Sequence, residues 1–134
     1  MLEFQAFSEK EAMMMNPLRL AHVGDAVHDL LVRTGLALRG GNVHSMHGGA
    51  VREVNAQAQA QALARIEPML SECEADIVRR GRNANAHHGV PKRVRPVDYA
   101  MATGLEALLG FLYLTGQTGR LKILYGAMQQ ETDQ

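Results

Sequence analysis

The chain has 134 residues, of which 46% are hydrophobic and 21% charged, and its 14 basic and 14 acidic side chains cancel to zero net charge. This length fits a single domain of roughly 100–200 residues, and the composition is that of a globular protein. The single cysteine, Cys73, excludes an intramolecular disulfide. Net charge favours no class of partner, so the distribution of charge along the chain has to be used instead.

The first long helix is predicted to begin at Asn16-Pro17, which have the residue types of an N-cap and a first helical position. The Gly40-Gly41 pair is predicted to end it. Between these signals, small and apolar residues recur at alternating spacings of four and three. This spacing predicts one buried stripe, made of Leu20, Gly24, Val27, Leu31 and Thr34.

A second long helix is predicted from Asn42, a residue type that caps helices, to about Ile66. Its Gly48-Gly49 pair lowers helix propensity by roughly 1 kcal/mol per glycine, so a kink or a close packing contact is expected there. Ser71 and Glu74 have the spacing of a capping box, which predicts the start of a short third helix.

The third helix is expected to end near Arg80, because Gly81, Gly89, Pro91 and Pro96 break regular structure in the segment that follows. Residues 81–96 are therefore predicted to be the one substantial loop of the chain.

Two further helices are predicted in the C-terminal third. Asp98 can cap the first, which should stop near Gly116, and Thr118 can cap the second, which should run to about Met128. The tail, 129–134, is expected to fray.

The run from 99 to 119 approaches the length of a membrane span. It contains Glu106, Gln117 and four glycines, so we expect a buried core helix and no membrane association. The N-terminus has no basic region followed by an apolar stretch, which favours a cytoplasmic protein. No segment alternates with period two, so the fold class is all-α, with five to seven helices in one domain, 1–134.

Two acids occupy apolar surroundings. Glu106 is the only charged residue between Asp98 and Arg120, and Asp25 lies within Leu20–Val27. An ionised carboxylate in such a setting is unfavourable unless a cation meets it. Asp25 and Glu106 together could hold Mg²⁺, a hard ion that prefers oxygen ligands. The alternative for each acid alone is a solvated position on a helix.

Two neighbours of Asp25 leave their roles open. Asp29, one turn further along the helix, is either an outer ligand of the same ion or a surface charge. His22, one turn earlier, could orient the carboxylate, although an ordinary half-buried histidine is the simpler interpretation. Their spacing does not match that of a zinc site.

Between Ile77 and Val97 the chain has six basic residues and no acid, and we call this the basic segment. Phosphate binding requires cations on a solvent-facing segment, and arginine offers a planar fork suited to phosphate. The alternative is an ordinary solvated loop. The segment lacks aromatic residues for stacking on single strands, so it fits the backbone of a duplex better. The candidate RNA-binding residues are Arg79, Arg80, Arg82, Asn83, Lys92, Arg93 and Arg95.

Two motifs resemble those of a known family. Gly24-Asp-Ala-Val27 and the segment Ala102-Thr-Gly-Leu-Glu-Ala-Leu-Leu-Gly110 are similar to the two acidic motifs of the ribonuclease III catalytic domain. The match is best with its Mini-III branch, which consists of this domain alone. The opening Met1–Phe4, the segment Val54–Ala60 and the segment Arg79–Ala84 also resemble that branch.

The resemblance implies an all-α homodimer that cleaves double-stranded RNA with Mg²⁺, each protomer supplying one centre that cuts one strand. It further implies a role in trimming the ends of precursor large-subunit (23S) ribosomal RNA. By motif position, Asp25 and Glu106 match the essential catalytic and metal-binding carboxylates. An accessory ribosomal protein is a partner that the sequence leaves open.

The sequence departs from full-length ribonuclease III at Leu18, Ala21 and Thr103, where acids would stand, so a four-acid metal cage is not expected. No double-stranded-RNA-binding domain follows in this sequence, and duplex affinity is then expected from the basic segment. Asn85 replaces a lysine often found there. Two alternatives remain: a non-catalytic double-stranded-RNA-binding or ribosome-assembly protein, and a helical dimeric interaction protein without an RNA role.

Overall fold

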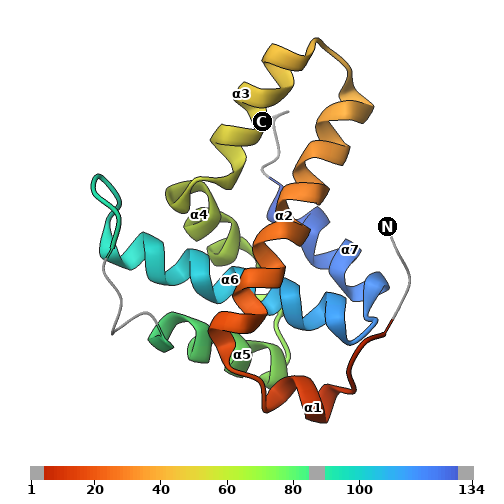
Figure 1. Cartoon of the computed structure of the whole chain (residues 1–134), viewed down its shortest axis with the longest axis vertical. Helices are drawn as coiled ribbons and strands as arrows, with labels where there is room; N and C mark the ends of the chain where they lie inside the picture. The colour runs from red at the N-terminus through yellow and green to blue at the C-terminus, as the bar shows by residue number, and fades with distance from the viewer. Residues whose placement is uncertain (1–4, 85–89, 130–134) are drawn as a thin grey trace.

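The computed structural model describes residues 5–84 and 90–129, except for the side chains of 49–54. These residues are helical and contain no strand, which confirms the all-α prediction. The elements, shown in Figure 1, are α1 (Glu9–Met13), α2 (Pro17–Arg39), α3 (Val43–Val54), α4 (Ala56–Ile66), the 3-10 turn η1 (Glu67–Met69), α5 (Glu72–Ala84), α6 (Pro96–Leu114) and α7 (Thr118–Met128).

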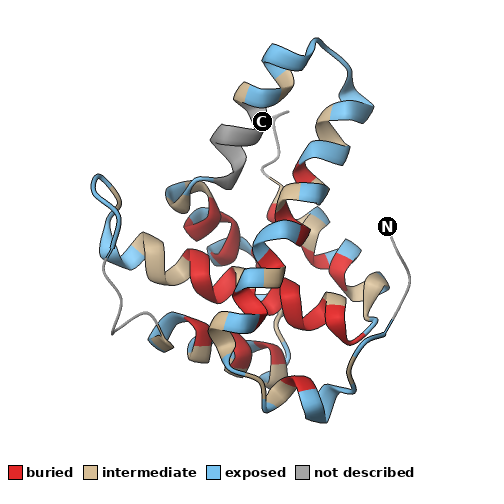
Figure 2. Ribbon diagram, in the orientation of Figure 1, coloured by how far each residue is buried: buried red, intermediate tan, exposed pale blue. Residues whose placement is uncertain are grey.

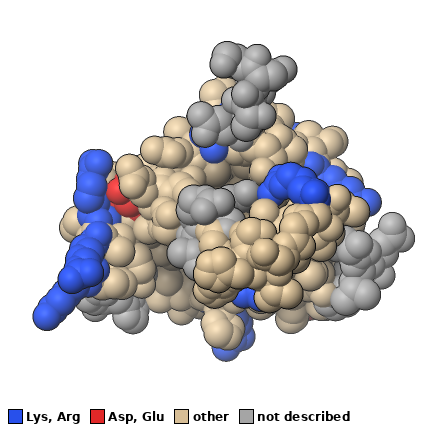
Figure 3. Space-filling view, turned by 90° about the horizontal axis from the view of Figure 1, so that it is seen from above, with Lys and Arg blue, Asp and Glu red and all other residues tan. Residues whose placement is uncertain are grey.

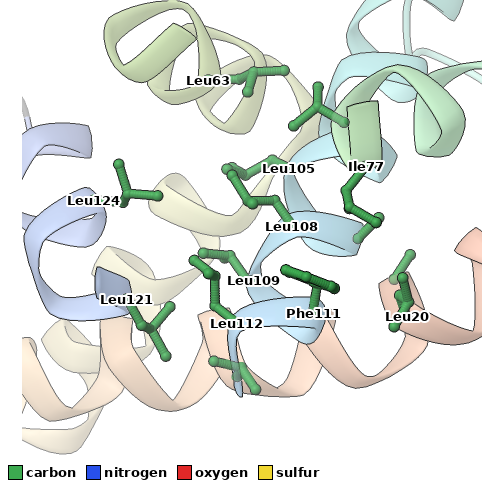
Figure 4. Packing of buried hydrophobic residues seen from close by; sticks show 14 of the residues in the cluster. Leu20, Leu63, Ile77, Leu105, Leu108, Leu109, Phe111, Leu112, Leu121 and Leu124 are labelled. Atoms are coloured by element: carbon green, nitrogen blue, oxygen red, sulfur yellow. The ribbon is translucent and has the colours of Figure 1, made fainter. Parts of the chain in front are cut away.

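Helix α6 forms the centre of the molecule, and α2, α4, α5 and α7 pack around it (Figures 1 and 2). In Figure 4 the leucines of α6 lie between side chains of α4 and α7 on one side and of α5 and α2 on the other. By length and composition alone α6 could cross a membrane, but 61% of its apolar window is buried inside the protein. The prediction of a core helix is confirmed.

Helices α2 and α6 cross at a pair of glycines. A Cβ atom on Gly24 would lie 1.6 Å from the backbone carbonyl oxygen of Glu106, and one on Gly110 would lie 2.0 Å from the carbonyl oxygen of Leu20. Neither distance can accommodate a side chain, so the two backbones touch only because both positions are glycine. The crossing therefore sets Asp25, the residue after Gly24, beside Glu106.

A second pair of glycines brings α5 against α6. A Cβ atom on Gly81 would lie 2.9 Å from the Cα of Gly104, and one on Gly104 would lie 2.8 Å from the carbonyl oxygen of Val78. The prediction that this helix ends near Arg80 was wrong, because α5 continues to Ala84. Gly81 serves close packing here and does not break the helix.

Several predicted helix boundaries are confirmed by their hydrogen bonds. The side chain of Asn16 accepts from the amide of Leu18 (2.9 Å), and Gly40 ends α2 with φ of 84°. Ser71 and Glu74 form the capping box of α5, with both bonds present (3.1 and 2.9 Å). These signals were readable because each is made within a few residues of the chain.

The predicted helix from Asn42 to Ile66 is two helices. Asn42 caps α3 as expected, but the chain leaves helical geometry at Asn55, whose side chain accepts from the amide of Ala58 (2.8 Å) and caps α4. The break falls at Asn55 and not at Gly48-Gly49, because an asparagine side chain can replace the backbone partner that a new helix lacks.

The N-terminal boundaries of the last two helices differ by a few residues from the prediction. Arg95 occupies the N-cap of α6, with Pro96 as the first residue, and Asp98 lies in the first turn instead of capping it. Gln117, not Thr118, is the N-cap of α7. The predicted end at Met128 is correct, and the tail beyond Gln129 lies outside the described residues.

Helix α1 was not predicted. It is capped by Ser8 and Glu11, whose side chains bond reciprocally to each other's backbone amides (3.1 and 2.9 Å). Its buried Ala12 joins the main core.

Candidate active site at the crossing of α2, α4 and α6

The structure brings Asp25 and Glu106 together. Asp25 is exposed on α2, Glu106 is half-buried near the middle of α6, and their carboxyl groups are in hydrogen-bond contact. The two residues are 81 positions apart in the chain (106 minus 25) and meet because Gly24 lets the α2 backbone touch the α6 backbone at Glu106 itself.

The surroundings of Glu106 change its ionisation. Burial, first, and then the charge and hydrogen bond of Asp25 raise the pKa of Glu106 from 4.5 to about 8, while a hydrogen bond from Gln59 acts in the opposite direction. At neutral pH, with only these protein groups around it, Glu106 keeps its proton. A cation between the two acids would replace that proton.

The donor atoms fit a hard divalent ion. Mg²⁺ is usually held by one or two carboxylates, with waters and substrate phosphate completing its shell. In the part of the chain that the structure describes, no group of three or more His, Cys, Asp or Glu side chains is arranged to hold a metal. The pair of Asp25 and Glu106 therefore suits a hard divalent ion whose remaining ligands come from outside the protein, and not a closed zinc site.

Gln59 is a part of this site that the sequence did not indicate. It lies on α4, its side chain is only 3% exposed, and it forms a hydrogen bond with the Glu106 carboxyl group. The site thus draws on three helices: α2 and α6 provide the acids, and α4 provides an amide.

The structure also places the two neighbours of Asp25. Asp29 accepts a hydrogen bond from Nε of Arg33, one turn further along α2 (3.0 Å), which favours its interpretation as a paired surface charge. His22 is exposed, so it is not the half-buried histidine considered from the sequence. The buried histidine of this helix is His28, whose ring meets Tyr125 edge-on with centroids 6.4 Å apart.

Six of the seven candidate RNA-binding residues are exposed. Figure 3 shows lysine and arginine side chains along the side on which residues 90–95 lie in Figure 1. Asn85 and the rest of 85–89 lie outside the described residues. We call the exposed set the basic edge; its members are Arg79, Arg82, Asn83, Lys92, Arg93 and Arg95.

Arg80 differs from the other cations. Its half-buried guanidinium donates to the backbone carbonyl oxygens of Met13 (2.5 Å) and Met15 (3.2 Å), which precede α2. This group is occupied within the chain, so we leave Arg80 out of the proposed RNA contact. Arg79 pairs with Asp76, and Arg95 lies 3.9 Å from Asp98, but both arginines remain largely exposed.

Comparison with known proteins gives the same region a family context. The sequence profile of the ribonuclease III domain matches residues 18–117, which include both acids and the basic edge. The chain is 51% identical over 106 residues to a Mini-ribonuclease 3 of Symbiobacterium thermophilum, covering 78% of this chain and 81% of that one. It is 44% identical over 119 residues to a Mini-ribonuclease 3 of Thermoanaerobacter sp., covering 88% and 83%.

A similar fold has been solved by crystallography. The X-ray structure of a protein from Fusobacterium nucleatum superposes on this chain with a TM-score of 0.78 at 27% sequence identity. The alignment covers 84% of this chain and 90% of that one.

Proposed function

This chain belongs to the ribonuclease III family, in its Mini-ribonuclease 3 branch, and from that premise we propose that it cleaves duplex RNA with Mg²⁺ held by Asp25 and Glu106. It is an endoribonuclease of the ribonuclease III type, from a family that acts on double-stranded RNA and is generally dependent on divalent metal ions. The choice of Mg²⁺ and the roles of the two acids are our proposal.

The main support for this role of the two acids is their contact. The carboxyl groups of Asp25 and Glu106, both predicted from the sequence, meet at the glycine crossing of α2 and α6. Two carboxylates in contact at a half-buried position are unstable as neighbours unless a proton or a cation lies between them. A structural role would be served better by uncharged side chains of the same size.

The proposed chemistry divides between the ion and the protein. A divalent ion bound there would polarise the phosphodiester and lower the pKa of a water molecule that attacks phosphorus. Asp25 is exposed and so accessible to RNA, while Glu106 is half-buried on α6 and hydrogen-bonded by Gln59 of α4. Ala21 and Thr103, two of the positions at which acids would stand in full-length ribonuclease III, are both buried and offer no carboxylate. The Thr103 hydroxyl donates to the carbonyl oxygen of Tyr99 (3.0 Å). The remaining ligands would then be water and RNA phosphate.

The basic edge is our candidate for duplex affinity. Its arginines and lysine are solvent-exposed and can contact phosphates without reading base sequence. This contact would be sensitive to salt, because each phosphate neutralised releases counterions.

Three finer points extend the proposal. The enzyme acts as a homodimer, in which two centres each cut one strand. Its substrate is the paired stem at the ends of precursor 23S ribosomal RNA, and it acts in the cytoplasm. The similarity to Mini-ribonuclease 3 proteins supports an endoribonuclease of this type, and the dimer, the substrate and the compartment are our proposal.

The test is cleavage of a labelled precursor ribosomal stem with Mg²⁺ and with a chelator, by the wild type and by Asp25→Asn and Glu106→Gln. We expect cleavage only by the wild type and only with Mg²⁺. Full activity in either variant would reject the role given to that acid. Duplex binding with no Mg²⁺-dependent cleavage would favour a non-catalytic RNA-binding protein.

A further inference from the structure

Helix α4 carries three glutamines at alternate positions, Gln57, Gln59 and Gln61, in an alanine-rich stretch. In a helix, residues four apart share a face, and the residue between them points to the opposite one. Gln57 and Gln61 are exposed, while Gln59 is 3% exposed. One of three chemically identical side chains is therefore buried.

The buried glutamine faces the catalytic acids. Helix α4 packs on α6, and the Gln59 side chain forms a hydrogen bond with the carboxyl group of Glu106. An ionised carboxylate can only accept hydrogen bonds, so in this pair the N–H₂ group of the Gln59 carboxamide is the donor. A buried amide is unfavourable without such a partner, so alanine or leucine would suit this position better if packing were its sole purpose.

We propose that Gln59 is a positioning residue, which holds the Glu106 carboxylate in place beside Asp25 for a divalent cation. The proposal rests on the function proposed above, since it presupposes an ion at this pair of acids. A glutamate side chain has three rotatable bonds, and a carboxylate left without a fixed donor would turn away from a like-charged neighbour. The amide of Gln59 opposes that movement from the rigid surface of α4.

Outer partners of this kind typically change metal affinity or activity by about 10- to 100-fold when removed. Gln59→Met is the matched substitution, because methionine is unbranched, close to glutamine in length and favourable in helices. The chain offers its own controls in Gln57→Met and Gln61→Met, which make the same change on the exposed face of the same helix.

The measurement is binding of Mn²⁺ alone to the full chain, followed by electron paramagnetic resonance of the free ion, with the melting temperature recorded for each variant. We expect Gln59→Met to bind Mn²⁺ about 10- to 100-fold more weakly. The two control variants should stay within about twofold of the wild type. The melting temperature shows whether each variant is folded at the temperature of the binding measurement. If this variant does not fold, Gln59→Leu takes its place.

The outcomes separate this inference from the function on which it rests. Wild-type affinity in a folded Gln59→Met, together with lost binding in Glu106→Gln, would overturn the role of Gln59 and leave the acid pair standing. Absence of Mn²⁺ binding in the wild type, or unchanged binding in Glu106→Gln, would overturn both. A purely structural role predicts unchanged Mn²⁺ affinity in a folded Gln59→Met, whatever its melting temperature.

Discussion

In the proposed function, the crossing of α2, α4 and α6 and the basic edge contribute to RNA cleavage in opposite ways. At the crossing, glycine contacts fix the backbones and set two acids and an amide against each other. At the basic edge, the cations of α5 and of residues 90–95 are exposed to solvent. Chemistry at a phosphodiester depends on position, whereas attraction to a phosphate chain depends mainly on charge. Substitutions should therefore abolish function at the crossing and reduce it gradually at the edge.

The largest effect is expected from the acids. Asp25→Asn and Glu106→Gln should each lower cleavage by at least about 1,000-fold, beyond the range typical of an outer partner, because a direct ligand of the ion is removed. Duplex binding should persist, which a filter-binding assay would show. Asp29→Asn, one turn away on α2 but paired with Arg33, is the control and should retain most activity.

A large effect is also expected from the glycine contact. Gly24→Ala should destabilise the protein by several kcal/mol, more than the roughly 1–3 kcal/mol of ordinary overpacking, because the new Cβ would meet the backbone oxygen of Glu106. It should also separate the acids and stop cleavage. Urea unfolding measures the first effect.

The same helix provides the control for that experiment. A Cβ on Gly35 would meet nothing nearer than the Arg39 guanidinium at 4.0 Å. Gly35→Ala should therefore be neutral or stabilise by up to about 1 kcal/mol through helix propensity. Equal stability losses at Gly24 and Gly35 would contradict the account of the crossing.

An intermediate effect is expected from pH. The pKa of Glu106 is about 8 in the folded chain and 4.5 ordinarily, so between these values the folded state holds a proton that the unfolded state has lost. The free energy of unfolding should then fall as pH rises through this window, by about 1.4 kcal/mol per pH unit.

The interval from about pH 7 to 8 is the best place to measure this effect. Burial lowers the pKa of His28 from 6.5, so this histidine is mostly neutral in both states there and contributes little. Urea unfolding in chelator should show the fall in the wild type and a flat profile in Glu106→Gln. The same slope in both proteins would mean that another group is responsible.

The smallest effects belong to the basic edge. Lys92→Ala, Arg93→Ala and Arg95→Ala should each weaken duplex binding severalfold and reduce the slope of log affinity against log salt by about one. Cleavage at saturating RNA should be nearly unchanged. Lys122→Ala, an exposed cation on α7, should leave both quantities as they are. A strong loss of turnover in an edge variant would erase the contrast between the two regions.

The sequence predicted the acid pair because an acid in an apolar run is visible locally, at Asp25 and at Glu106. It could not show Gln59, because Gln57, Gln59 and Gln61 look alike until tertiary packing selects which face of α4 is buried. The internal hydrogen bonds of Arg80 could not be predicted for a similar reason, since its acceptors at Met13 and Met15 lie more than sixty residues away.

The helix boundaries were likewise predictable only where the signal is local. Caps such as Asn16 and Ser71 were predicted because their bonds are local. Gly81 suggested a helix end, yet the space that its missing side chain leaves is filled by Gly104 of another helix. Local chemistry could be inferred from the sequence, and contacts between distant helices could not.

The most direct test of the central claim is a crystal structure of the wild type grown with Mn²⁺, examined by anomalous scattering. The account predicts a manganese peak bound by carboxylate oxygens of both Asp25 and Glu106 at the α2–α6 crossing. A structure in which the two side chains face different surroundings, or in which manganese binds elsewhere and leaves this pair without an ion, would contradict it.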